Sequence, residues 1–143
     1  MSKVFIFDPD SNTLASIKDV LEWEGHEVRG CSNATCALKC IMGWIQEDGK
    51  GPDIILVEYF APEGDPPNRG GGWLSLELKR PGPAAQIPLV IMCAKGKARS
   101  VAVLTKVFRE RYGAVAYLSK PFNLGTIRDA VNGLLWAHSS FHS

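Results

Sequence analysis

Five short apolar runs, rich in β-branched residues, alternate along the chain with segments whose apolar residues recur at helical spacing. The runs cover residues 4–7, 26–30, 54–57, 89–92 and 115–118. Parallel strands need crossover connections, and crossovers place helices on both faces of a sheet. The alternation therefore predicts an α/β fold with three layers, in which a doubly wound, five-stranded parallel sheet has the strand order 2-1-3-4-5.

The segments between the runs carry apolar residues on one helical face, and residues 73–79 are predicted as a shorter helix. The repeating residues are Leu14, Ile17 and Leu21, then Ala37, Cys40, Ile41 and Trp44, then Val101, Leu104 and Phe108, and finally Leu124, Ile127, Val131 and Leu134. Residues that favour helix N-termini precede three of these segments: Asp10 or Ser11, Asn33 and Asn123.

The length of 143 residues is typical of one domain, so we expect a single domain over residues 1–143 with a short C-terminal tail from about residue 138. Sixteen lysines and arginines balance 15 aspartates and glutamates, so overall charge does not indicate nucleic-acid binding. No apolar run is long enough to cross a membrane, and the first run is too short for a signal-peptide core. These features predict a cytoplasmic protein whose four cysteines are reduced.

Charged and thiol side chains stand at the predicted strand ends. Asp8 and Asp10 follow the first run and Glu58 follows the third, while Cys93 and Lys120 end the fourth and fifth. In doubly wound sheets ligands bind beyond the carboxyl ends of the strands, here at the switch point between the first and third. Carboxylates beside an ammonium group suit a divalent cation or a phosphoryl group. Taken alone, Asp10 is equally suited to capping the following helix.

Four segments, 3–8, 53–62, 87–94 and 113–122, resemble CheY-like response-regulator receiver domains, and the resemblance covers nearly the whole chain. The last segment is the most specific, because it contains a Gly-Ala pair, the switch aromatic and a Lys-Pro-Phe ending. The resemblance implies a module of a two-component phosphorelay that signals through protein contacts and is not an enzyme. It implies a phosphoacceptor position at Glu58, an acidic pocket of Asp8 and Asp10, switch and phosphate-contact positions at Cys93, Tyr117 and Lys120, and a weak Mg²⁺ site of Asp8, Asp10, Glu58 and Phe60.

Three positions depart from the family pattern. Glu58 stands where the family has an aspartate, and a shift of a reacting group by about 1 Å can cost on the order of 100-fold in rate. Pro9 replaces the second acid of the pair that follows the first strand, and Mg²⁺ requires near-ideal oxygen ligation. Cys93 replaces a hydroxyl with a weaker hydrogen-bond donor. We therefore expect weakened Mg²⁺ binding and inefficient phosphotransfer, with mimicry of the phosphorylated state by Glu58 as an alternative.

An enzyme alternative rests on the order Asp8, Asp10, Thr13, which is similar to the loop of haloacid-dehalogenase-type phosphatases. In that family the first aspartate is the nucleophile and the second the general acid and base. The family also needs an acidic pair after its fourth strand, and this chain has Lys95-Gly96-Lys97 there. A flavodoxin-like FMN protein fits less well, because no phosphate-binding loop follows the first run.

Basic residues are concentrated between positions 95 and 111, in a segment with a single glutamate. They are Lys95, Lys97, Arg99, Lys106, Arg109 and Arg111. The stretch is interpreted either as a solvated helix face or as part of the docking face that receivers build from helix 4, strand 5 and helix 5. The partners implied are a histidine kinase, a phosphotransfer protein or an effector protein, with a homodimer left open and no direct nucleic-acid contact expected.

Two further features are interpreted structurally. Cys31, Cys36 and Cys40 lie close in sequence without a second pair of metal ligands, so we expect core packing in preference to a zinc site. Residues 63–72 form a Gly- and Pro-rich connection, whose glycines are interpreted as a source of flexibility.

Overall fold

The computed structural model describes residues 2–59, 70–94, 106, 109–111, 113–120 and 123–142. In chain order its elements are β1 (Lys3–Phe7), α1 (Ser11–Trp23), β2 (Glu27–Cys31), α2 (Ala34–Asp48), β3 (Ile54–Glu58), α3 (Gly71–Leu78), β4 (Leu89–Ala94), β5 (Ala116–Lys120) and α5 (Leu124–His142).

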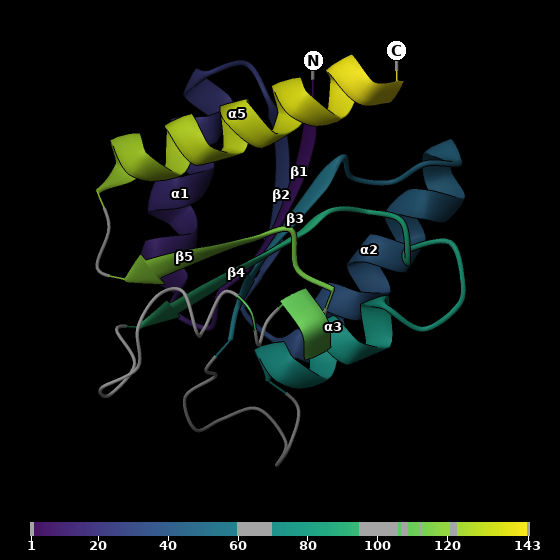
Figure 1. Ribbon diagram of the computed structural model, residues 1–143. Coiled ribbons are helices and arrows are strands. Elements are labelled where there is room, and N and C mark those ends of the chain that lie inside the picture. The colour runs from purple at the N-terminus through teal and green to yellow at the C-terminus, as the bar shows by residue number, and fades with distance from the viewer. Residues whose placement is uncertain are drawn as a thin grey trace.

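All neighbouring strands of the sheet are parallel, and their order is β2-β1-β3-β4-β5. Helices α1 and α5 cover one face of the sheet, and α2 and α3 cover the other (Figure 1). The predicted three-layer, doubly wound α/β fold is therefore confirmed. With right-handed crossovers, this strand order places α1 and α5 on one face of the sheet and α2 and α3 on the other.

The central strands are apolar on both faces because helices cover both sides of them. Every residue of β3 is buried, as are residues 4–7 of β1. Side chains alternate between two clusters: Phe5 and Phe7 pack toward α2 and α3 together with Trp44, whereas Val4 and Ile6 pack toward α1 and α5. This alternation determines which face each residue at a strand end points to.

Three of the helices are preceded by the capping residues that the sequence predicts. The Asp10 carboxylate caps α1, and the Asn33 side chain accepts a 3.0 Å hydrogen bond from the Cys36 N–H at the start of α2. Asn123 accepts a 2.8 Å hydrogen bond from the Thr126 N–H in the first turn of α5. Each side-chain oxygen satisfies a backbone donor that the helix itself leaves unbonded.

The described strands agree with the predicted runs to within two residues, and two helix boundaries differ from the sequence-based expectation. Helix α3 begins at Gly71, two residues before the predicted start at 73. Helix α5 continues to His142, so residues from 138 onward extend the helix where a tail was expected. The reason is local, because neither proline nor glycine follows Gly133 to end the helix. The helix predicted around residues 101–108 lies outside the described residues, apart from residue 106.

Candidate functional site

Asp8 and Glu58 lie at the same level at the carboxyl edge of the sheet. Phe7 pairs with Val57 in the register of β1 and β3, so the next residue on each strand is Asp8 and Glu58 respectively. Both are buried, with 1% of Asp8 and 5% of Glu58 exposed. By strand alternation both point to the α1 and α5 face of the sheet. The structure thus brings together two carboxyl groups from the predicted set.

The turn after β1 is organised by Asp8. Its Oδ1 accepts a 2.9 Å hydrogen bond from the Asp10 N–H, and its own N–H donates a 3.3 Å hydrogen bond to the Cys31 carbonyl oxygen at the end of β2. The first contact closes the short turn over Pro9. The second ties the turn to the neighbouring strand. The Asp10 N–H therefore holds the Asp8 carboxyl group, and the end of β2 holds the Asp8 backbone.

Asp10 is exposed, and its carboxylate serves the helix. Its Oδ1 accepts hydrogen bonds of 2.9 Å from the Asn12 N–H and 3.2 Å from the Thr13 N–H. An N-capping carboxylate of this kind stabilises a helix by about 1 kcal/mol. A role for Asp10 as a metal ligand or as an acid and base would compete with these two contacts.

The remaining predicted site residues lie on β4 and β5 or directly after β3. Cys93 is buried and packs with Ile91, Ala114 and the half-buried Tyr59. In the register of β4 and β5, Tyr117 pairs with Ile91 and Lys120 pairs with Ala94. The backbone of both β5 residues thus lies on the strand next to Cys93, whereas Phe60 falls outside the described residues.

Gly71 is a site residue that sequence reasoning missed. A Cβ atom built on Gly71 would overlap the Glu58 carbonyl oxygen and would lie 2.7 Å from the Glu58 carbonyl carbon and 2.8 Å from Tyr59 Cα. The first turn of α3 therefore packs directly on the backbone that carries Glu58. Interpreting this glycine as a source of flexibility was wrong, since it is buried and allows close approach. The run of three glycines at 70–72 was the available signal.

Metal ions in proteins are held by groups of His, Cys, Asp and Glu side chains, and such groups can be looked for among the described residues. Among them, no three or more His, Cys, Asp or Glu side chains form a group that could hold a metal ion. In this part of the chain, no helix is both long and apolar enough to cross a membrane.

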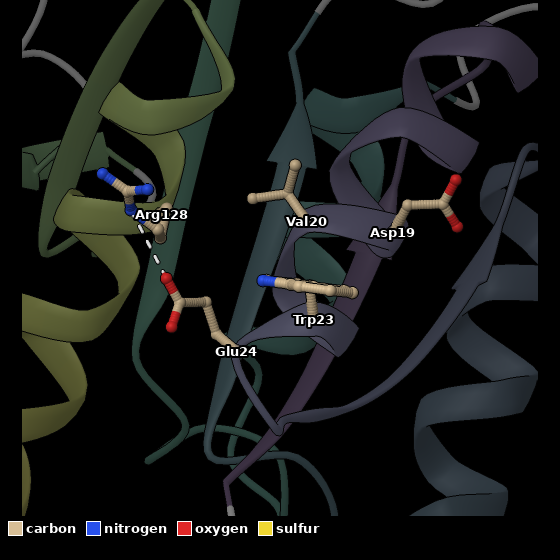
Figure 2. A pocket seen from close by; sticks show the side chains of 5 residues that line it. All are labelled: Asp19, Val20, Trp23, Glu24 and Arg128. Carbon is tan, nitrogen blue, oxygen red and sulfur yellow. Dashed lines mark ion pairs between the residues drawn. The ribbon is translucent and has the colours of Figure 1, made fainter.

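A surface pocket lies between α1 and α5, away from the acidic edge (Figure 2). It is lined by Asp19, Val20, Trp23, Glu24 and Arg128. Arg128 Nε lies 3.5 Å from Glu24 Oε1, and Trp23 is 91% exposed. Because α1 rises about 1.5 Å per residue, Trp23 is roughly 20 Å along the helix from the cap at Asp10. The pocket contains none of the predicted site residues.

The basic stretch is described in part. Lys106, Arg109 and Arg111 are helical and exposed, as is Glu110. Lys95, Lys97 and Arg99 lie outside the described residues. The described basic residues are therefore accessible to solvent.

The cysteines of β2 and α2 differ from the prediction of core packing. Cys36 and Cys40 are exposed, and only the half-buried Cys31 packs against the core. The apolar stripe of α2 is formed by Ala37, Ile41, Trp44 and Ile45 with Ala34. Cys40 directly precedes the buried Ile41, and the turn of one residue along the helix is enough to place its side chain outside this stripe.

No family model matches the chain. Protein PilH of Pseudomonas aeruginosa is 24% identical to it over 135 residues, which cover 94% of this chain and 98% of PilH.

Several solved structures share its fold. A response regulator receiver domain from Clostridium thermocellum is 21% identical with a TM-score of 0.74, and the match covers 99% of each chain. A CheY-like receiver domain protein from Methanospirillum hungatei is 22% identical with a TM-score of 0.73, covering 98% of each chain. NtrX from Brucella abortus, solved in complex with ADP, is 21% identical with a TM-score of 0.76, and 99% of this chain matches 28% of NtrX. The chain therefore has the fold of CheY-like receiver domains.

Proposed function

We propose that this chain is a receiver module of a two-component signalling system that acts through protein contacts, and that its pocket has lost efficient phosphotransfer. The observation that carries the proposal is the position of Glu58, a buried carboxyl group at the end of β3, at the same level as Asp8. In this fold, ligands bind at the carboxyl edge where the strand order reverses, which is between β1 and β3.

The altered acceptor follows from the length of the Glu58 side chain. A glutamate reaches one methylene further than the aspartate of the family pattern. The Glu58 backbone has little freedom to compensate, because α3 packs on it at Gly71. An in-line attack on a phosphodonor depends on placement to well within 1 Å, and an error of about that size costs roughly 100-fold.

The donor set fits Mg²⁺ poorly. Pro9 offers no side-chain oxygen, and Asp10 is exposed and engaged in capping α1. Asp8 and Glu58 remain as carboxylate donors. Phe60, the last residue of the predicted set, has no side-chain oxygen. Mg²⁺ is held in near-ideal octahedral geometry and is sensitive to the loss of a ligand. We therefore propose that cation binding at this edge is weak.

Protein partners would dock on the face that contains α5 and β5. Lys106, Arg109 and Arg111 precede β5 in the chain and are exposed, and a basic surface favours an acidic partner. A histidine kinase, a phosphotransfer protein or an effector protein is the class of partner that such a module serves. We place its action in the cytoplasm, where these partners operate.

Incubation with acetyl phosphate and Mg²⁺, followed by intact-mass spectrometry, tests the proposal. We expect no stable phosphoryl adduct on the wild-type chain, and partial Mg²⁺-dependent adduct formation on the double variant Glu58→Asp with Pro9→Asp. A stoichiometric adduct on the wild type that Glu58→Gln abolishes would overturn the claim of lost phosphotransfer. The same preparation, assayed with a generic phosphomonoester and compared with Asp8→Asn, tests the phosphatase alternative.

A further inference from the structure

Two thiols from different elements meet at the edge of the sheet. Cys31 is the last residue of β2, and Cys40 lies in the middle of α2, which packs beside that strand. Their Sγ atoms are 3.2 Å apart and both thiols are free. A disulfide bond is about 2.05 Å long, so the two sulfur atoms must approach each other by about 1.2 Å to form one.

The other cysteines are less suited to pairing with either of them. Cys36 is one helical turn before Cys40, and side chains at that spacing have Cβ atoms about 5–6 Å apart. A disulfide needs Cβ atoms roughly 3.5–4.5 Å apart, so a bond between Cys36 and Cys40 would distort the helix. Cys93 is buried in the separate cluster with Ile91 and Ala114. The 3.2 Å contact between their sulfur atoms therefore favours the pair of Cys31 and Cys40 among the four cysteines.

We infer that Cys31 and Cys40 form an oxidation site, at which hydrogen peroxide converts the two thiols into an intramolecular disulfide. The sulfur of Cys40 attacks one oxygen of the peroxide, the O–O bond breaks, and the leaving hydroxide takes the thiol proton to become water. Cys40 is then a sulfenic acid. The sulfur of Cys31 attacks the Cys40 sulfur, the S–O bond breaks, and the departing hydroxide takes the Cys31 proton as a second water. The two thiols are oxidised by two electrons, and the peroxide is reduced by two.

The order of these steps follows from exposure. Cys40 is exposed on α2 and meets the oxidant first, whereas Cys31 is half-buried against the core. Burial, together with the adjacent Cys40 thiol, raises the pKa of Cys31 to about 12, which keeps this thiol protonated and unreactive toward peroxide in solution. Cys31 is thus the resolving residue, in contact with the sulfur that is oxidised.

Tryptic mapping of the full-length protein after mild hydrogen peroxide treatment tests the inference directly. Cleavage after Arg29 and Lys39 places Cys31 in peptide 30–39 and Cys40 in peptide 40–50. We expect a monomer lighter by two hydrogen atoms, with two of its four thiols no longer alkylated and these two peptides joined until a reductant is added. A product joined between two chains, or peptides that never join while the thiols disappear, would overturn the inference.

Single variants assign the bond. Cys31→Ser and Cys40→Ser should each abolish the joined peptides, and Cys36→Ser should leave them unchanged. Cys36→Ser is the matched control because it removes an exposed thiol that shares α2 with Cys40 and the tryptic peptide with Cys31. Persistence of the crosslink in Cys31→Ser would identify Cys36 as the partner of Cys40 and refute the pairing. The wild-type peptide map decides the question even if a variant folds poorly.

Discussion

Two pairs of reactive side chains lie at the carboxyl edge of this sheet, and they differ in their access to solvent. Asp8 and Glu58 end the central strands β1 and β3, which have neighbours on both sides and helices on both faces, and both residues are buried. Cys31 ends the edge strand β2, and its partner Cys40 faces solvent from α2. The position of a strand in the sheet thus determines whether a group at its end is shielded from reagents or open to them.

The backbone support of the two pairs also differs. The acidic edge is backed by a close contact between α3 and β3 that only glycine permits. The thiol pair includes Cys40, which is exposed on α2. We expect the acidic edge to respond more strongly to changes in packing, and the thiol pair to respond to chemical modification.

Replacement of Gly71 by alanine should have the largest effect. The new methyl group would overlap the Glu58 backbone, so α3 or β3 must move, and we expect the free energy of unfolding to fall by about 3 kcal/mol. Urea denaturation measures the loss. Gly43→Ala is the control, because that glycine is helical with open space around it and should gain about 0.5–1 kcal/mol. Equal behaviour of the two variants would show that the contact at Gly71 is not rigid.

Oxidation of the thiol pair should have the next largest effect. A disulfide that closes a loop of this size restricts the unfolded chain and contributes about 2–3 kcal/mol. The melting temperature should therefore rise by about 5–10 °C after peroxide treatment and return after reduction. Cys40→Ser should show no such rise in differential scanning calorimetry. A melting temperature that falls on oxidation would indicate that the bond strains the contact between β2 and α2.

Loss of the α1 cap should have a smaller effect. Asp10→Ala removes the acceptor of two backbone N–H groups and should lower stability by about 1 kcal/mol. Asp10→Ser retains a capping oxygen and should remain within a few tenths of a kcal/mol of the wild type. If both variants lose the same amount, the carboxylate acts through its charge at the acidic edge and not as a cap.

A carboxylate at the opposite edge of the sheet should give the smallest effect. Asp48 accepts a hydrogen bond from Lys3 Nζ and others from the Gly51 and Lys50 N–H groups, which together hold its pKa below the usual range. Because the pKa is lower in the folded state, this stabilisation is present above the unfolded pKa of about 4 and is lost as the pH falls. Lys3→Met should therefore flatten the decline in stability between about pH 5 and about pH 3, as measured by urea midpoints. An unchanged slope would assign the acid sensitivity to other carboxylates.

The fold was predictable because its signals are local and repeated. Apolar runs and helical periodicity gave the strand order, and Asn33 and Asn123 marked the starts of helices. The meeting of Asp8 and Glu58 followed from the same reasoning, since the carboxyl ends of parallel strands share one edge.

The missed features depend on distances that no sequence spacing encodes. Asp10 suits a cap and an acidic pocket equally well, and only the hydrogen bonds of its Oδ1 show which contacts it makes. Gly71 matters because of where α3 packs on β3. Cys40 differs from the buried Ile41 by one residue on α2, and its contact with Cys31 depends on how that helix lies against β2.

The hydrogen bond from the Asp8 N–H to the Cys31 carbonyl oxygen joins the two pairs through the backbone. Thermodynamic linkage is reciprocal, so any cation or phosphorylated group that binds more tightly to the oxidised chain than to the reduced one must shift the reduction potential of the thiols by the same free energy. If this contact gives the oxidised and reduced chains different affinities for such a ligand, the reduction potential of Cys31 and Cys40 would report what occupies the acidic edge.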